Sequence, residues 1–523
     1  MSKQSFLVDR IVQQCAERDD TPAVLCAGVS HSYRSLALRA RRFANVLNSA
    51  DQIKARPRIA YFGKVSSEYY ELLLTALITG GVFVPVNWRL APMEAVDIIR
   101  DAEVDVIVIE PDFLEIADSL LASDVKGATL FLTGGGVREG GAGYESSIAN
   151  SSEEFDIVKT DEDAAVLQLY TSGTTGVPKG VQLSHSGLLA QFELFNNLPL
   201  VGRITPDDVL FVCLPGFHVV GAAYMLQGLF RGAQAVIQRD FDPVSACKLI
   251  DEHKVTHTVF VPTIIAMIIQ TAQQSNADLS SLRALFYGTS PISEELLKAV
   301  PSVLSCSLFQ AYGLTEAGGL VTVLPPEDHS PQAGNRLKSA GFAGAGVEVR
   351  VVDPSGEVCA TEQSGEIIIR SPTLMSGYWK KPEETAAVIK DGWFHTGDIG
   401  FLDEDGYVFL RDRLKDMIIT GGENVYPAEL ERVLMTCPGV ADVAVVGVPD
   451  EKWGEAVLAV IIRSADSNLN ADDIRAYTRE RLAGYKVPKH VEFRNDLPRN
   501  HMGKVLKREV REPYWKGQSR QVS

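Results

Sequence analysis

Short apolar runs alternate with amphipathic stretches of helical period between residues 58 and 288, and no other feature constrains the fold as strongly. The runs typical of buried strands lie at 58–63, 82–87, 104–110, 165–170, 208–215, 233–238, 257–262 and 284–288. Intervening stretches such as 67–80 and 92–103 have the apolar spacing of helices. Strands buried on both faces appear as continuous apolar runs, and helices connect parallel neighbours. The alternation therefore predicts parallel sheets covered by helices.

The texture of the sequence changes twice after this region. From about residue 340 the strands are short and separated by glycine turns, which is typical of a small barrel or antiparallel sheet. Near residue 414 a third block begins, with expected helices at 427–435 and from Asn470, and expected strands at 441–449, 456–463 and 490–496. A chain of 523 residues exceeds what one hydrophobic core usually organises. We expect two domains, residues 1–413 and 414–523.

Composition excludes several classes of partner. The formal net charge of −17 disfavours nucleic acid and anionic membranes, which both reward excess Lys and Arg. The seven cysteines show no CxxC spacing, so neither a metal cluster nor a disulfide framework is expected. The sequence has no run of the roughly 20 apolar residues that span a membrane, and its N-terminus does not read as a signal peptide. A cytoplasmic protein that binds small molecules is expected.

The stretch "YTSGTTGVPKG", residues 170–180, has the composition of a phosphate-binding loop. It differs from the common nucleotide loop because Val177 and Pro178 precede the lysine and Gly180 follows it. Hydroxyl donors, glycines that let backbone N–H groups approach an anion, and one cation occur together. These residues are Thr171, Ser172, Gly173, Thr174, Thr175, Gly176 and Lys179. The pattern predicts a strand, this loop and then a helix around residues 184–195, an arrangement suited to binding an anion; a plain polar turn is the alternative.

Six motifs in order resemble the adenylate-forming enzymes, which include acyl-CoA and aryl-CoA synthetases, peptide-synthetase adenylation domains and firefly luciferase. They lie at 170–180, 312–316, 365–379, 391–400, 412–431 and 497–509. The resemblance implies an acid–thiol ligase that joins a carboxylic acid to AMP, releases pyrophosphate and passes the acyl group to coenzyme A. It further implies two doubly wound parallel sheets and a small β-barrel in the large N-terminal domain, followed by a smaller, mobile α+β domain. The small molecules implied are ATP, Mg²⁺, CoA and the acid.

The resemblance assigns roles around the nucleotide. Glu316 is expected to bind Mg²⁺, which prefers oxygen ligands, and Thr315 to donate to the α-phosphate. Tyr312 would pack on adenine, with Asp398 and Arg413 at the ribose, where one carboxylate can accept from both hydroxyls. The remaining expected nucleotide contacts are Gly288, Thr289, Ser290, Gln310, Ala311 and Gly313. Without the resemblance, a core tyrosine, an exposed turn aspartate and a surface ion pair are the ordinary readings of Tyr312, Asp398 and Arg413.

Lys504 and its surroundings would by composition alone form a solvated basic face. The resemblance instead implies that Lys504 lies between the attacking and bridging oxygens during adenylation. Lys415 matches the hinge residue about which the C-terminal domain rotates, and Gly421 and Gly422 would then line the thiol channel. No residue suggests itself as a base for the thiol.

The segment 214–225 corresponds to the acyl-pocket lining of the family. Amino-acid-activating relatives usually carry an Asp where this chain has His218, so an amino acid is disfavoured, and His218 is expected to close the channel until the adenylate forms; a satisfied core histidine is the alternative. Small residues here suggest a roomy apolar pocket, although close helix packing accounts for them equally well. A medium- or long-chain fatty acid is favoured, with aryl or 4-coumarate-type acids next. A luciferase-like oxygenase, a non-catalytic nucleotide-binding module and a homodimer remain open.

Overall fold

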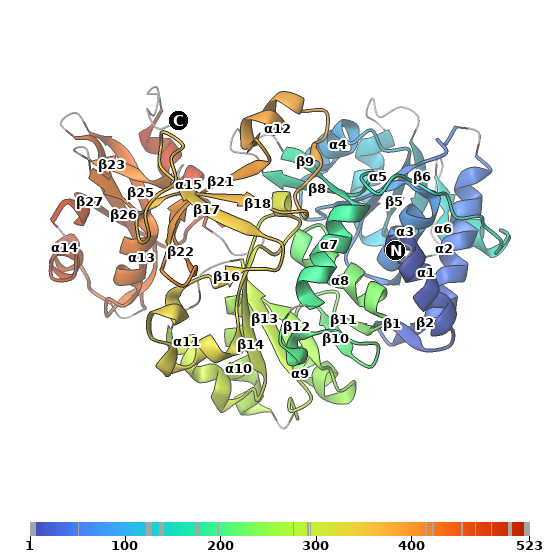
Figure 1. Ribbon diagram of the computed structural model, residues 1–523, viewed down its shortest axis with the longest axis horizontal. Coiled ribbons are helices and arrows are strands. Elements are labelled where there is room, and N and C mark those ends of the chain that lie inside the picture. The colour runs from blue at the N-terminus through green and yellow to red at the C-terminus, as the bar shows by residue number, and fades with distance from the viewer. Residues whose placement is uncertain are drawn as a thin grey trace. The chain divides into compact units, whose positions relative to one another are not determined.

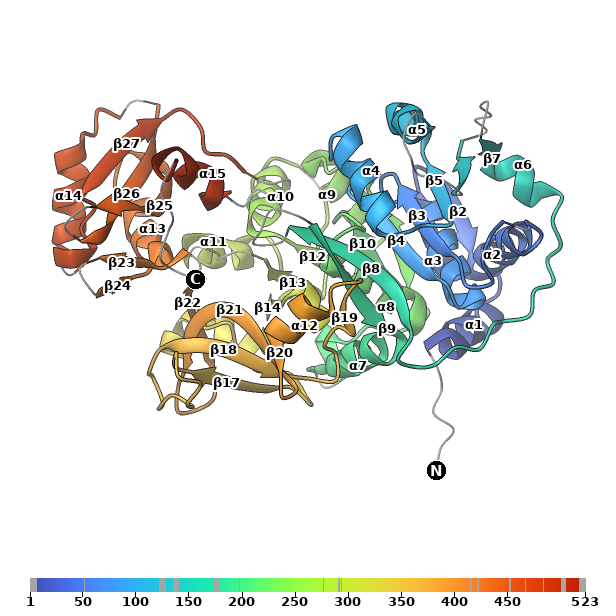
Figure 2. The same cartoon turned by 90° about the horizontal axis from the view of Figure 1, so that it is seen from above.

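The computed structural model describes residues 7–50, 52–121, 128–134, 141–172, 178–196, 198–275, 277–289, 292, 294–413, 416–420, 423–450, 453–465, 467–482, 484–499 and 505–516. The chain divides into two compact units. Unit 1 contains Met1–Glu348 and Arg370–Phe394, and unit 2 contains Val349–Ile369 and His395–Ser523. Figures 1 and 2 label the elements of each unit. The expected domain boundary between residues 413 and 414 stays a prediction.

The first sheet of unit 1 has nine strands among the described residues, in the order β16-β15-β14-β13-β12-β10-β11-β1-β2. All neighbours from β1 to β14 are parallel, whereas the edge strands β2, β15 and β16 are antiparallel to theirs. The strands are β1 (Pro22–Cys26), β2 (Val29–Ser32), β10 (Val209–Val212), β11 (Gln234–Ile237), β12 (His257–Phe260), β13 (Ala284–Gly288), β14 (Ser307–Tyr312), β15 (Thr322–Leu324) and β16 (Phe342–Ala343).

The second sheet of unit 1 has eight described strands in the order β19-β9-β8-β4-β3-β5-β6-β7. It is parallel from β8 to β7, and β9 and β19 extend it in antiparallel fashion. The strands are β3 (Arg58–Phe62), β4 (Val82–Val86), β5 (Val106–Ile109), β6 (Thr129–Leu132), β7 (Ala142–Gly143), β8 (Ala165–Ser172), β9 (Pro178–Ser184) and β19 (Gly377–Tyr378). The predicted parallel sheets and the eight expected strands are confirmed.

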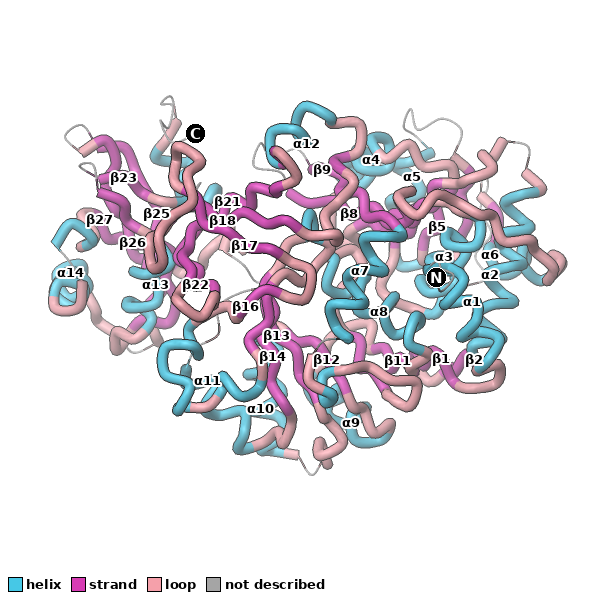
Figure 3. The backbone as a smooth tube through the Cα atoms, in the orientation of Figure 1, coloured by secondary structure: helices cyan, strands magenta, loops and turns pink. Residues whose placement is uncertain are grey.

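Helices connect these strands, as the alternation of cyan and magenta in Figure 3 shows. α3 is buried on every side and has clear ends: the Ser66 side chain accepts from the Tyr69 N–H, and Gly80 ends the helix with φ +64°. The described helices of unit 1 are α1 (Leu7–Glu17), α2 (Tyr33–Asn48), α3 (Ser67–Thr79), α4 (Pro92–Asp101), α5 (Leu114–Leu121), α6 (Tyr144–Ala149), α7 (His185–Asn196), α8 (Val219–Arg231), α9 (Pro243–Glu252), α10 (Pro262–Gln274), α11 (Glu294–Ala299) and α12 (Pro382–Val388). None of the described helices is long and apolar enough to cross a membrane.

One strand near the candidate phosphate loop was not predicted. Residues 178–184 form strand β9, which pairs in antiparallel fashion with β8. Val181 and Leu183 are buried in β9, and their backbone pairs with Leu169 and Leu167 of β8. The helix predicted around residues 184–195 is confirmed as α7, which begins at His185. This helix therefore follows β9 and does not follow the loop directly.

Unit 2 includes most of a curled sheet in which β17 (Glu348–Val352), β18 (Gly365–Arg370), β21 (Trp393–Leu402) and β20 (Ile389–Lys390) follow one another and β22 (Val408–Arg413) pairs with β21. This sheet occupies the region predicted to form a small barrel. A second sheet follows the order β24-β23-β26-β25, and β27 pairs with β26. Its strands are β23 (Ile418–Thr420), β24 (Glu423–Val425), β25 (Val440–Asp450), β26 (Gly454–Arg463) and β27 (His490–Arg494).

The second sheet of unit 2 is covered on both faces. Ile474 of α14 (Ala471–Arg479) and Leu430 of α13 (Pro427–Met435) pack in one apolar cluster, and Val510 of α15 (Lys507–Arg511) packs in another. Asn470 begins α14 as predicted, because its side chain accepts from the backbone N–H groups of Asp472 and Asp473. The expected C-terminal α+β architecture is confirmed.

A buried ion pair links α2, α3 and α6 in unit 1. The Glu71 side chain has no exposed surface; it accepts from Arg39 Nε at 2.6 Å and from the Tyr144 hydroxyl at 2.9 Å. Burial raises the pKa of Glu71 to about 7, and the hydrogen bonds and charge of Arg39 act in the opposite direction. Because the folded pKa lies above the unfolded one, the contribution of Glu71 to stability is complete at low pH and is lost as pH rises through about 7.

We predict that Arg39→Met destabilises the fold in a pH-dependent manner. The substitution leaves the Glu71 carboxylate buried without its cation, which typically costs about 3–5 kcal/mol, and protonation of Glu71 relieves that cost. Thermal unfolding should therefore show a larger decrease in Tm at pH 8 than at pH 6. Arg34→Met is the matched control, because Arg34 pairs with Asp19 at the exposed surface and such pairs contribute about 0–1 kcal/mol. An equal Tm decrease for Arg39→Met at both pH values would contradict the prediction.

Candidate active site

The carboxyl ends of β13 and β14 carry the residues expected around adenine. The two strands are parallel neighbours with Gly288 opposite Ala311, and the Tyr287 hydroxyl donates to Gln310 Oε1 at 3.2 Å. Thr289 follows β13 with φ +69°, a left-handed conformation that is unfavourable for a β-branched residue. Ligands of parallel α/β sheets bind at the carboxyl ends of strands. The fold therefore brings the two predicted adenine segments together from positions distant in sequence.

Close backbone contacts explain why glycine occupies two of these positions. A Cβ atom on Gly288 would overlap the carbonyl oxygen of Ala311, and one on Gly313 would overlap the carbonyl oxygen of Gly319. The chain after β14 thus folds back tightly on itself. This reversal holds the single turn η4 (Thr315–Ala317) beside the end of the strand.

Glu316 is oriented by a segment more than fifty residues downstream. The Tyr378 hydroxyl donates to Glu316 Oε1 at 3.0 Å, and the Met375 N–H donates to the Glu316 carbonyl at 2.8 Å. Thr373 Oγ1 donates to the carbonyl of Ala317 at 2.8 Å. The described residues contain no group of three or more His, Cys, Asp or Glu side chains placed to hold a metal. One oriented carboxylate suits Mg²⁺, which proteins commonly bind through one or two carboxylates.

Lys179 of β9 also contacts the side chain of Tyr378. Its Nζ lies 5.0 Å from the centre of the Tyr378 ring and 2.6 Å from Glu384 Oε2 of α12. The hydrogen bond from Lys179 lowers the pKa of Glu384. Burial, and next the charge of Glu316, raise the pKa of Tyr378 well above its usual value. Tyr378 therefore stays protonated and can donate to Glu316. The carboxylate of Glu384 forms an ion pair with Lys179, the cation expected to bind phosphate.

Tyr378 and Glu384 were not predicted as functional residues. Tyr378 lies inside the motif at 365–379, but nothing in the sequence pairs it with Glu316, 62 positions away. β19 provides that connection by pairing with β9, the strand that carries Lys179. Glu384 forms an ion pair with Lys179, and the expectation that Lys179 binds phosphate stays a prediction.

The two residues expected at the ribose are direct register partners in unit 2. Asp398 of β21 lies opposite Arg413 of β22. Asp398 is buried, its N–H donates to Thr396 Oγ1 at 3.0 Å, and that hydroxyl donates to the Ile367 carbonyl at 2.6 Å. For Arg413 the structure describes only the backbone. Strand pairing thus joins two motifs that the sequence could only treat separately.

His218 lies within residues 214–225, the segment expected to line the acyl pocket, and directly precedes α8. Its ring centre lies 4.6 Å from that of Phe217, and its carbonyl accepts from the Ala222 N–H at 2.9 Å. A Cβ atom on Gly221 would overlap the carbonyl of Pro215, so close packing, rather than pocket volume, requires glycine there. At Gly319 a Cβ would meet no atom nearer than 3.6 Å.

Several predicted residues cannot be placed. Thr171 lies near the end of β8, opposite Lys179, whereas the side chain of Ser172 is not described. The predicted residues outside the described ranges are Gly173, Thr174, Thr175, Gly176, Ser290, Lys415, Gly421, Gly422 and Lys504.

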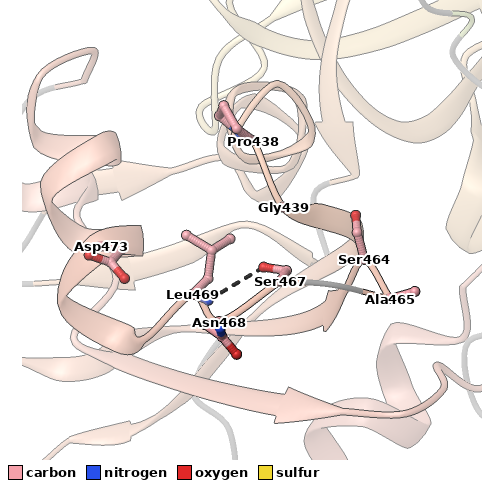
Figure 4. Close-up of a pocket in the computed structure, with 8 residues that line it drawn as sticks. All are labelled: Pro438, Gly439, Ser464, Ala465, Ser467, Asn468, Leu469 and Asp473. Atoms are coloured by element: carbon pink, nitrogen blue, oxygen red, sulfur yellow. Dashed lines mark hydrogen bonds between the residues drawn. The ribbon is translucent and has the colours of Figure 1, made fainter.

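A surface hollow in unit 2, shown in Figure 4, contains none of the predicted residues. It is lined by Pro438, Gly439, Ser464, Ala465, Ser467, Asn468, Leu469 and Asp473. Asp473 Oδ2 accepts from the Asn470 N–H at 2.9 Å and so serves the start of α14. With an aspartate as the one charged group of its lining, the hollow is unsuited to phosphate.

We predict that Gly313→Ala disrupts the turn that carries Glu316. Relief of the overlap with Gly319 requires the backbone to move, and a shift of about 1 Å can lower activity about a hundredfold. ATP–pyrophosphate exchange should fall by that order, with a lower Tm. Gly484→Ala is the control, because no atom lies within 4 Å of a Cβ there. Near-normal exchange by Gly313→Ala would show that the turn adapts.

We also predict that Glu384→Gln strengthens ATP binding. The substitution removes the carboxylate that competes with phosphate for Lys179, and an ion pair of this exposure contributes about 1 kcal/mol or less, which limits the gain to about fivefold. Calorimetry should show tighter binding of ATP and unchanged binding of adenosine. Glu383→Gln provides the matched control on an adjacent exposed residue. Weaker ATP binding by Glu384→Gln would instead mean that Glu384 positions Lys179.

Comparison with known proteins identifies the family of the chain. The model of the AMP-binding enzyme family matches residues 11–379, and the model of the AMP-binding enzyme C-terminal domain matches residues 429–504. A fatty acid–[acyl-carrier-protein] ligase, ScoC of Streptomyces coeruleorubidus, is 38% identical over 96% of this chain and 95% of its own length. A feruloyl-CoA synthase of an Amycolatopsis species is 37% identical over 94% and 95%, respectively.

Among solved structures, ATP-bound MatB from Rhodopseudomonas palustris superimposes with a TM-score of 0.87 at 33% identity, covering 98% of this chain and 99% of that one. Together with the family models, these matches extend over both units of the chain. The chain therefore belongs to the AMP-binding, adenylate-forming enzyme family and is an AMP-forming acid–thiol ligase.

Proposed function

We propose that this enzyme activates a medium- or long-chain fatty acid as its acyl adenylate and transfers the acyl group to coenzyme A. The observation that carries the proposal is the convergence of Lys179 and Glu316 on Tyr378. A phosphate-binding cation and a carboxylate suited to Mg²⁺ are the two charged groups that a reaction at a nucleoside triphosphate requires beside each other.

The first half reaction joins two anions. A carboxylic acid with a pKa of about 4 is ionised at neutral pH, so its oxygen needs no base to attack the α-phosphorus. The new acyl–oxygen–phosphorus bond forms as the bond to the bridging oxygen breaks and pyrophosphate leaves. Electrostatic repulsion is the main obstacle, and fixed cations lower it. Lys179, once released by Glu384, would hold the departing phosphates with the hydroxyls of residues 171–175.

The other groups of this half reaction have separate tasks. Tyr378 keeps the Glu316 carboxylate oriented, and Glu316 would hold Mg²⁺, which when bound neutralises phosphate charge. Thr315 would donate to the α-phosphate. In keeping with the family, we assign Lys504 to the charge that develops between the attacking and bridging oxygens. Losing such a charge costs about 3–4 kcal/mol of barrier where it has been measured for a single oxyanion donor.

The adenosine part would be held by groups from both motif regions. Gln310, Ala311 and Tyr312 on one strand and Gly288 and Thr289 on the next would contact adenine. Asp398 and Arg413 would bind the ribose hydroxyls, and their register pairing supports a shared role.

In the second half reaction a thiolate sulfur attacks the acyl carbon, the thioester forms and AMP leaves. We propose that rotation about Lys415 exchanges Lys504 for the Gly421–Gly422 segment, with residues 1–413 and 414–523 moving as domains. CoA is the proposed thiol. The likeness to a ligase named for an acyl-carrier protein makes a protein-bound thiol the alternative acceptor.

Relatives support two classes of acid. The fatty acid ligase likeness favours an aliphatic chain, and the feruloyl-CoA synthase likeness favours an aryl acid as the second candidate. His218, which lies within the segment that corresponds to the pocket lining, would close the channel until the adenylate has formed.

We predict that Lys504→Ala lowers the rate of acid-dependent ATP–pyrophosphate exchange at least about a hundredfold and leaves ATP binding in place. The reason is that the charge of Lys504 acts mainly on the transition state. A panel of fatty, aryl and amino acids identifies the substrate, and thioester analysis with CoA and with a carrier protein identifies the thiol. Lys516→Ala is the control, since Lys516 is an exposed lysine near the same end of the chain. Exchange that survives in Lys504→Ala would remove Lys504 from the mechanism; no exchange by the wild type with any acid would contradict the proposed function.

A further inference from the structure

Three elements of unit 1 meet around Gly319, three residues after Glu316. Gly319 has φ +122°, and a Cβ built on it would lie 3.6 Å from Cγ2 of Val219 and 4.0 Å from both Cδ and Oε1 of Gln191. Val219 is the first residue of α8 and directly follows His218, and Gln191 lies on α7. The amide of Gln191 therefore lies next to the turn that holds Glu316 and next to the start of the expected acyl-pocket segment.

The side-chain amide of Gln191 is buried, and its oxygen accepts no hydrogen bond from the described residues. The residue is 2% exposed, and its Oε1 has no hydrogen-bond partner among the described residues. Buried side-chain polar atoms are nearly always hydrogen-bonded, and leaving one unsatisfied is unfavourable. The nearest other side chain at Gly319 is that of Val219, which is apolar and buried. A polar partner that arrives with a ligand would satisfy the buried amide oxygen.

We propose that Gln191 determines substrate specificity by hydrogen-bonding a hydroxyl group on the acyl part of the acid. This inference rests on the proposed function, because it concerns the acid that the enzyme adenylates. A hydroxyl can donate to Oε1 and accept from the amide N–H, so it suits either orientation of the side chain. The preferred acids are then hydroxylated acids rather than their unsubstituted analogues.

The size of the expected selectivity follows from the cost of an unpaired polar group. A pocket built to hydrogen-bond a substrate hydroxyl rejects the analogue that lacks it, because the protein group is then left buried and unpaired. One such hydrogen bond corresponds to at least about a tenfold difference in kcat/KM. If the amide is replaced by an apolar side chain of similar shape, the unsubstituted acid should be accepted better and the hydroxylated acid worse.

The test compares matched acids in ATP–pyrophosphate exchange. Hydroxydecanoic acids with the hydroxyl at successive carbons are each compared with decanoic acid, and hydroxyphenylpropanoic acids are compared with phenylpropanoic acid. The variants are Gln191→Met and the matched control Gln227→Met. Gln227, on α8, is also 2% exposed and has a buried Nε2 with no partner among the described residues, but it is not among the side chains nearest to Gly319.

The wild type should prefer one hydroxylated acid by at least about tenfold in kcat/KM, Gln191→Met should lose or invert that ratio, and Gln227→Met should keep it. Equal ratios in wild type and Gln191→Met, or a wild type that prefers every unsubstituted acid, would overturn the inference and leave the proposed function intact. Absence of exchange with all acids would overturn both. If Gln191→Met fails to fold, as judged by Tm, the wild-type ratio and the ratio in Gln191→Leu decide.

Discussion

The side chain of Tyr378 joins the two charged groups of the proposed nucleotide site. Its hydroxyl donates to Glu316, and its ring lies beneath the ammonium of Lys179. Both contacts require β19 to pair with β9, because that pairing brings residues around 378 to the strand that carries Lys179. The same downstream segment donates hydrogen bonds to the carbonyls of Glu316 and Ala317. The short antiparallel strand β19 at the edge of a mainly parallel sheet thus determines how Glu316 and Lys179 lie relative to each other.

Charge compensation and backbone proximity have different roles in this site. Glu384 pairs with Lys179, so this largely buried cation is not left without an opposite charge. The contacts at Gly288 and Gly313, by contrast, are steric and leave no room for a side chain. The glycines thus let backbone segments near Glu316 approach one another closely.

The sequence predicted regular elements well where a single periodicity dominated. The strands β3, β4 and β13 agree with their apolar runs to within a residue, and the Asn470 cap was identified from its own side chain. β9 was missed because its register with β8 depends on a neighbouring strand rather than on local composition. Tyr378, Glu384 and Gln191 were missed for a related reason: each acquires its role only through contact with an element far away in the chain. The small residues of 214–225 suggested a pocket, yet Gly221 serves close packing.

By itself, the sequence determined the kind of fold, the family and the types of chemical groups in the site, because apolar period and motif spacing are local properties of the chain. Tertiary structure decided which of these groups meet. Strand pairing placed Gly288 beside Ala311 and Asp398 beside Arg413, and it brought Glu316 and Lys179 to one tyrosine. The tertiary structure also places the buried amide of Gln191, on α7, beside Gly319. The physical reason is that charge, burial and hydrogen bonding depend on distances in space, which the order of residues does not contain.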